Sequence, residues 1–287
     1  MDALETAPAV DGAPGKRQPG RAGRNLPAAI GVGVGLGLLV TVPLFSPYRW
    51  VFIVVLVAAA GLGTWEVVKA LRTLGAQPPL VPLLAGSVLM VVLPYRQGSG
   101  ELFLGLALTV LACAVWRLAE PAEGYLRDLS AAALTSAYVP FLAGFAALLT
   151  ASPGDGPRRV TVFVATVVCS DVGGYAAGVL FGRHPLAPNV SPKKSWEGLA
   201  GSTVACAVAG AVFFPTLFDA SSLLGVAYGL AVVATATLGD LGESMIKRDI
   251  GIKDMGTLLP GHGGLMDRLD SLLPTAPVAW LLLTLFL

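Results

Sequence analysis

Long apolar runs separated by short polar segments form the main pattern of this 287-residue chain. An α-helix rises about 1.5 Å per residue and the hydrocarbon core of a bilayer is about 30 Å thick, so roughly 20 apolar residues can cross it as a helix. The pattern predicts an all-α, polytopic membrane protein with about nine transmembrane helices, of which the third and the ninth are short. The predicted spans are residues 27–45, 50–69, 80–95, 102–118, 130–150, 160–182, 199–218, 222–242 and 273–287.

The composition agrees with this prediction. Hydrophobic residues make up 55% of the chain, charged residues make up 13%, and the mean hydropathy is +0.74, so the chain cannot cover itself with polar surface. Cys113, Cys169 and Cys206 all lie in apolar runs without a CxxC spacing. That placement favours small core residues over disulfides or a zinc site.

The chain is predicted to have three parts. Residues 1–25 are rich in Ala, Pro, Gly and charge and have no apolar period, which is typical of a disordered tail, here a cytosolic one. The apolar run that follows is too long for a cleaved signal peptide. Residues 26–158 are predicted as N-terminal transmembrane helices. Residues 159–287 are predicted as a C-terminal transmembrane region that carries the candidate chemistry.

Positive charge is distributed unevenly between the two ends of the predicted helices. With the N-terminus in the cytosol, fifteen of the nineteen Lys and Arg residues lie on that side. The positive-inside rule predicts this orientation, although residues with a chemical role can account for part of the excess. The polar loop before the seventh span and the polar loop after the eighth span then both face the cytosol. Only Arg49, Arg96, Arg158 and Arg159 lie on the other side.

The segment before the last predicted helix concentrates polar side chains. Lys247, Arg248 and Arg268 can neutralise phosphates, and Asp267 and Asp270 offer hard oxygen ligands for a divalent cation. Glycines between them leave backbone amides accessible. This mixture predicts a site for a metal and a nucleotide.

The end of the eighth predicted helix adds to this cluster. Asp240, Glu243, Ser244 and Lys247 follow at spacings of i, i+3, i+4 and i+7, so they share one helix face. The alternative is an amphipathic helix end with solvated charge. Asp240 lies too close to the apolar run to suit that alternative.

Asp171 lies in the middle of an apolar run. An unpaired carboxylate in hydrocarbon costs a few kcal/mol, so this side chain must face protein, water or a cation. Tyr175 and Gly178 follow at i+4 and i+7 on the same helical face. We predict a functional role for Asp171; the alternative is a structural hydrogen bond that clamps two helices.

The loop SPKKSWEG precedes the seventh span. Ser195 or a neighbour is a candidate N-cap, so that free amides at the start of the helix would point at the loop. Lys193 and Lys194 are either interfacial anchors or contacts to phosphate. The adjacent Glu197 favours phosphate contact, because anchoring does not require an acid.

The two histidines differ in their surroundings. His184 is interpreted as a solvated loop residue. His262 lies in the sequence PGHGG and is followed by Gly263 and Gly264. This backbone is flexible enough to form an anion-binding nest, so His262 or a neighbouring amide is a candidate contact to phosphate.

These residues resemble the signature of a known family. The run SMIKRDIGIKDMGTLLPGHGGLMDRLD is similar to the signature of phosphatidate cytidylyltransferases, the CDP-diacylglycerol synthases, in its Ser, Lys-Arg, Lys-Asp, His-Gly-Gly and Asp-Arg-x-Asp elements. Ser170, Asp171, Tyr175 and Gly178, with the SPKKSWEG loop, also resemble upstream motifs of the family. The resemblance spans residues 165–287, with hydrophobic likeness alone before them.

The resemblance implies transfer of a cytidylyl group from the co-substrate CTP to phosphatidic acid, at the cytosolic face of a bacterial inner membrane. Mg²⁺ is the expected cofactor, with Asp240 and Asp267 as its ligands and room for a second cation. The predicted catalytic residues are Asp171, Lys247, Arg248, Asp267, Arg268 and Asp270, and the predicted CTP-binding residues are Ser191, Lys193, Lys194, Glu197, His262, Gly263 and Gly264.

Two other functions stay open at this point. A CTP-dependent polyprenol or phytol kinase would phosphorylate an alcohol, and an ion-coupled transporter would use Asp171 and Asp240 as an ion path. The signature argues against the kinase, and the His-Gly-Gly loop with its flanking bases argues against the transporter. The expected partners are CTP, phosphatidic acid and the lipid bilayer, with no nucleic acid; a homodimer is left open.

Overall fold

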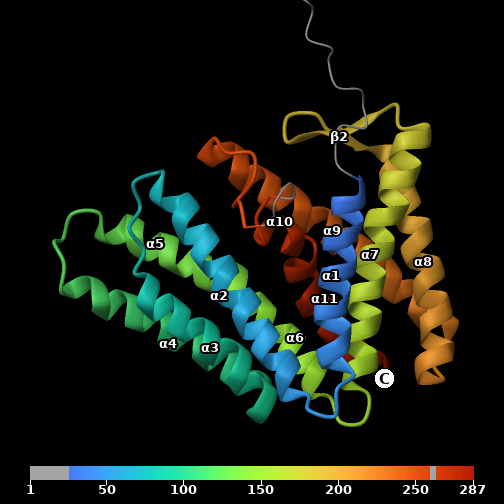
Figure 1. Cartoon of the computed structure of the whole chain (residues 1–287), viewed down its shortest axis with the longest axis horizontal. Coiled ribbons are helices and arrows are strands. Elements are labelled where there is room, and N and C mark those ends of the chain that lie inside the picture. The colour runs from blue at the N-terminus through green and yellow to red at the C-terminus, as the bar shows by residue number, and fades with distance from the viewer. Residues whose placement is uncertain (1–25, 259–262) are drawn as a thin grey trace, which may run out of the picture.

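The computed structural model of the chain describes residues 26–258 and 263–287 (Figure 1). The tail predicted for residues 1–25 lies outside them. The elements are α1 (Leu26–Leu44), α2 (Trp50–Arg72), α3 (Leu80–Gln97), α4 (Ser99–Leu118), α5 (Tyr125–Ser136), the π-helix η1 (Ala137–Phe141), α6 (Leu142–Ala151), α7 (Gly156–Phe181), β1 (Pro185–Ala187), β2 (Ser191–Ser195), α8 (Trp196–Phe218), α9 (Ser222–Ile250), α10 (Met266–Leu269) and α11 (Leu272–Phe286).

The number of membrane spans agrees with the sequence pattern. Within the described part of the chain, eight helical segments are long and apolar enough to cross a membrane, and α1 adds a shorter apolar helix. The all-α polytopic fold with about nine helices is therefore confirmed, and the protein is an integral membrane protein. The last span begins earlier than predicted, because α10 and α11 together form one segment, Met266–Phe286. The predicted boundary between residues 158 and 159 falls inside α7.

Glycines set the spacing of α7, α8 and α9, which lie side by side in the structure (Figure 1). A Cβ atom at Gly173 would meet the Cβ of Ala205 at 2.6 Å and the carbonyl oxygen of Gly201 at 2.8 Å. Gly210 and Gly225 approach each other so closely that a Cβ on either would overlap the other's carbonyl oxygen. Small residues let helix backbones pack closely in membranes. The polar side chains on these helices are therefore held on a tightly packed frame.

The fifth span, Tyr125–Ala151, is one helical segment in which the π-helix η1 joins α5 to α6. Pro140 lies in this turn and has no N–H to donate, so the regular hydrogen-bond ladder is broken there. π-helical turns occur often at functional sites. Here the turn carries Tyr138, whose buried hydroxyl has no hydrogen-bond partner among the residues that the structure describes.

Candidate active site

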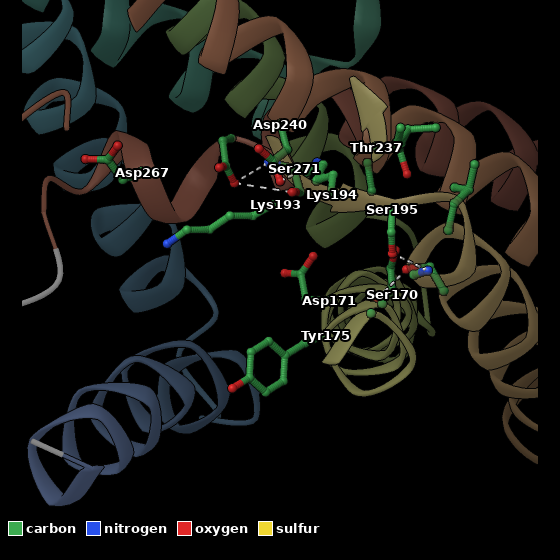
Figure 2. A pocket seen from close by; sticks show the side chains of 18 of the residues that line it. Ser170, Asp171, Tyr175, Lys193, Lys194, Ser195, Thr237, Asp240, Asp267 and Ser271 are labelled. Atoms are coloured by element: carbon green, nitrogen blue, oxygen red, sulfur yellow. Dashed lines mark hydrogen bonds and ion pairs between the residues drawn. The ribbon is translucent and has the colours of Figure 1, made fainter. Parts of the chain in front are cut away.

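A cavity of about 470 Å³ is lined by residues of α7, α8, α9 and α10 and of the β1–β2 hairpin (Figure 2). Its wall combines acids, bases and hydroxyls, which is unusual for a cavity between mainly apolar helices. The charged residues that line it are Asp171, Lys193, Lys194, Asp240, Asp267, Arg268 and Asp270, and the hydroxyl-bearing ones are Ser170, Tyr175, Ser195, Ser202, Thr237 and Ser271.

Three acids form one electrostatic group in this cavity. Asp171, Asp240 and Asp270 come from α7, α9 and the junction between α10 and α11, and all three are near enough for their charges to interact. Lys194 Nζ lies 2.5 Å from Asp240 Oδ2. Figure 2 shows Asp171 pointing into the open space opposite Asp240 and Lys194. The predicted face of Asp171, Tyr175 and Gly178 is confirmed, because all three line the cavity.

Asp267 lies apart from that group, at the edge of the cavity (Figure 2). Its Oδ1 accepts a hydrogen bond from Lys247 Nζ at 2.8 Å, and its Oδ2 accepts from the backbone amides of Met255 at 3.0 Å and Gly264 at 2.8 Å. The buried Glu243 lies 3.4 Å from the same lysine. Asp267 therefore ties the loop after α9 to α9 itself.

Part of the predicted polar face of α9 lines the cavity, and part of it is buried in the protein interior. Ser244 Oγ contacts Asp240 Oδ1 at 3.4 Å, and Lys247 contacts Glu243 one turn further on, as the spacing predicted. Asp240 lines the cavity, whereas Glu243 is fully buried. One face thus serves both the cavity and the interior of the protein.

The first five residues of SPKKSWEG form β2, the second strand of a short antiparallel hairpin in which Pro185 pairs with Ser195, and the last three begin α8. Ser195 is the N-cap of α8, as predicted, because its Oγ accepts a hydrogen bond from the Gly198 amide at 3.1 Å. This geometry places Lys193 and Lys194 at the mouth of the cavity. A backbone preceding a helix N-terminus is well suited to binding anions.

Glu197 holds the hairpin in place. One carboxylate oxygen lies 2.6 Å from His184 Nδ1, and the other accepts from the amides of Arg183 and His184. The interpretation of His184 as only a solvated loop residue is therefore incomplete, because its exposed ring is paired. Arg248 Nε also donates to the carbonyl of Val190 in the hairpin turn, at 3.3 Å.

The structure brings together about half of the predicted site residues. The predicted residues that line the cavity are Asp171, Lys193, Lys194, Asp240, Asp267, Arg268 and Asp270. Other predicted residues lie around it: Ser191, Glu197 and Arg248 belong to the hairpin and its contacts, and Lys247, Gly263 and Gly264 to the loop around Asp267. His262 lies outside the described residues.

Sequence reasoning missed two residues near this site. Tyr138 comes from the π-helix and lies near enough to Glu243, Asp270 and Asp240 to interact with their charges. Glu66 comes from α2 and is fully buried against the segment that begins α10. A signal for Glu66 was present, since it is an acid at the end of an apolar run. Tyr138 gave no signal, because the π-turn that places it is not readable from the sequence.

Comparison with known proteins adds to this geometry. The family model described as the cytidylyltransferase family matches residues 27–286. The chain belongs to this family. A phosphatidate cytidylyltransferase of Mycobacterium leprae is 47% identical over 92% of this chain and 89% of its own length. One from Mycobacterium tuberculosis H37Rv is 45% identical over 94% of this chain and 87% of its own. The chloroplastic phosphatidate cytidylyltransferase 4 of Arabidopsis thaliana is 31% identical over 88% and 70%.

The family match confirms the resemblance predicted from the signature residues. It also covers the N-terminal helices, where the sequence alone offered only hydrophobic likeness. The cavity is formed entirely by the C-terminal elements, yet the match includes α1 to α6. The N-terminal helices are therefore part of the region that the family model describes.

Proposed function

We propose that this protein transfers the cytidylyl group of CTP to phosphatidic acid, giving CDP-diacylglycerol and pyrophosphate. The observation that carries the proposal is a cavity in which Lys193, Lys194 and Arg268 lie with Asp171, Asp240 and Asp270, in a chain that is 47% identical to a phosphatidate cytidylyltransferase. Such a cavity suits a reaction between two polyanions, because bases neutralise the phosphates and acids can hold a cation.

The reaction needs little base catalysis. A phosphate oxygen of phosphatidic acid is already anionic; it attacks the α-phosphorus of CTP, and the bond from that phosphorus to the bridging oxygen breaks as pyrophosphate leaves. The barrier lies in bringing the two anions together in line. Positioning and charge neutralisation by Lys193, Lys194 and Arg268 supply the catalysis.

The acids of the cavity fit Mg²⁺. The described residues contain no cluster of three or more His, Cys, Asp or Glu that could hold a metal alone. Mg²⁺ typically uses one or two carboxylates together with substrate phosphates and water, which Asp240 with Asp171 or Asp270 can provide. Asp267 suits this role less, because Lys247 and two amides occupy its oxygens. When bound with the nucleotide, Mg²⁺ would neutralise the charge on the leaving pyrophosphate.

A pyrophosphate-release assay tests the proposal. Purified protein with CTP and phosphatidic acid should release pyrophosphate, and should form CDP-diacylglycerol, only when both substrates are present. A CTP-dependent kinase would instead release CDP and require an alcohol, and a transporter would cleave nothing. Absence of pyrophosphate with both substrates present, from folded protein, would overturn the proposed reaction.

The two lysines of the hairpin should determine the affinity for CTP. We expect replacement of both Lys193 and Lys194 by Gln to raise the KM for CTP by at least about 10-fold, because even one hydrogen bond to a charged group contributes about 1.5–3 kcal/mol. Lys69→Gln is the control, since Lys69 lies in the last turn of α2 and does not line the cavity. Initial rates over a range of CTP concentrations measure the effect. An unchanged KM would support the alternative that the lysines are interfacial anchors.

The hairpin and the loop after α9 should both face the cytosol. Asn189 and Thr257 are exposed residues in these two loops, so each can be replaced by Cys and tested with an impermeant thiol reagent. We expect protection in intact cells and labelling in inverted membrane vesicles. Pro153→Cys, in the exposed loop between α6 and α7, should show the reverse pattern. Labelling of Asn189→Cys from outside intact cells would contradict this orientation.

A further inference from the structure

Glu66 is a fully buried acid on α2, a helix that lines no part of the cavity. A carboxylate at such a position is costly unless polar groups satisfy it. Its Oε1 accepts a hydrogen bond from the Leu265 amide at 3.1 Å, and its Oε2 accepts from the Met266 amide at 2.8 Å. The side chain thus binds backbone that lies 199 and 200 residues further along the chain.

The loop is shaped to admit this carboxylate. A Cβ at Gly264 would meet Glu66 Oε2 at 2.6 Å, and a Cβ at Gly256 would overlap Glu66 Oε1. One turn earlier on α2, a Cβ at Gly63 would meet the Sδ of the buried Met266 at 2.9 Å. Three glycines on two segments therefore leave space for Glu66 and Met266 to seat α10 against α2, where Figure 1 places it.

A second carboxylate, that of Asp267, binds the same loop. Asp267 accepts hydrogen bonds from the backbone amides of Met255 and Gly264. Together with the two amides that donate to Glu66, four backbone amides between α9 and α11 are bound by these two carboxylates. The residues that follow Met266 are Asp267 and Arg268, and both line the cavity. Where the backbone of Met266 is fixed, the backbone positions from which these two side chains extend are fixed as well.

We propose that Glu66 is a positioning residue of the cytidylyltransferase site: its buried carboxylate fixes the start of α10, and thereby Asp267 and Arg268, at the edge of the cavity. The expected effect on turnover rests on the proposed function. The statement that Glu66 fixes the start of α10 does not depend on it. It gives the N-terminal half of the chain a specific part in building a site whose lining comes from the C-terminal half.

Glu66→Gln tests this role. Gln keeps the size and one acceptor oxygen, but its NH₂ group would face the N–H of Leu265 or Met266, so one of the two contacts is lost. We expect hydrogen–deuterium exchange of the amides in 263–267 to be at least about ten-fold faster, with exchange in α7 and α8 unchanged. We also expect kcat/KM to fall by roughly 10- to 100-fold, because small displacements of positioning groups are costly to catalysis.

Two further variants make the test specific. Glu101→Gln changes a partly exposed glutamate at the start of α4 and should leave both exchange and turnover unchanged. Gly256→Ala places a methyl group against the Glu66 carboxylate from the loop side, and should reproduce the faster exchange even if Glu66→Gln does not fold.

The outcomes are distinguishable. Parental exchange in 263–267 in both Glu66→Gln and Gly256→Ala would overturn the proposal, and so would faster exchange throughout the helices, which would indicate a general structural role. Lost turnover with parental exchange would also overturn it. If the parent protein released no pyrophosphate, the proposed function would fail, while the exchange measurement would still decide whether Glu66 fixes α10.

Discussion

Replacement of Asp240 by Asn should reduce kcat/KM at least about 100-fold, equivalent to roughly 3 kcal/mol of transition-state stabilisation. Asp240 lines the cavity and forms an electrostatic group with Asp171 and Asp270. Asn keeps the size of the side chain but removes the charge that would hold a cation against the phosphates of CTP. It also removes the charge that faces Lys194 at 2.5 Å.

The dependence on Mg²⁺ identifies the cause. We expect the Mg²⁺ concentration for half-maximal activity to rise several-fold in Asp240→Asn, while the protein remains folded in detergent, because Asp240 is partly exposed to the cavity. Asp249→Asn is the matched control, an exposed aspartate on the same helix. Near-parental turnover with an unchanged Mg²⁺ requirement would exclude Asp240 as a metal ligand and make Asp171 or Asp270 the candidate.

Replacement of Asp267 by Asn should also abolish most activity, but by loosening the loop after α9. The change breaks a largely buried pair with Lys247 and weakens the bonds to the Met255 and Gly264 amides. Breaking a buried ion pair costs about 3–5 kcal/mol, and we expect the lower end because Glu243 still lies 3.4 Å from Lys247. The unfolding temperature in detergent should therefore fall clearly.

Stability and Mg²⁺ dependence together distinguish the roles of the two aspartates. For Asp267→Asn we expect lower stability with little change in the Mg²⁺ concentration for half-maximal activity, whereas Asp249→Asn should leave both unchanged. The opposite result, parental stability with a strongly raised Mg²⁺ requirement, would make Asp267 the metal ligand that the sequence first predicted. Thermal unfolding and Mg²⁺ titrations on the same preparations measure both quantities.

The sequence by itself determined the class of fold and the family. Nine apolar stretches, most of them long enough for a bilayer, require helices, because backbone groups in hydrocarbon must be satisfied within their own segment. The signature residues between Ser244 and Asp270 are close together in the chain, so their likeness to the family was readable without a structure. The N-cap Ser195 and the polar face of α7 at Asp171 were predictable for the same reason: both depend on local spacing.

Only the tertiary structure decided how these acids and bases are distributed. Asp240 and Asp267 looked equivalent in the sequence, yet one pairs with Lys194 at the cavity and the other binds Lys247 and two amides of its own loop. Glu66 lies 199 and 200 residues before the two amides that donate hydrogen bonds to it, and sequence periodicity does not indicate contacts at that separation. Helix periodicity shows which residues share a face, but packing between helices decides what each face meets.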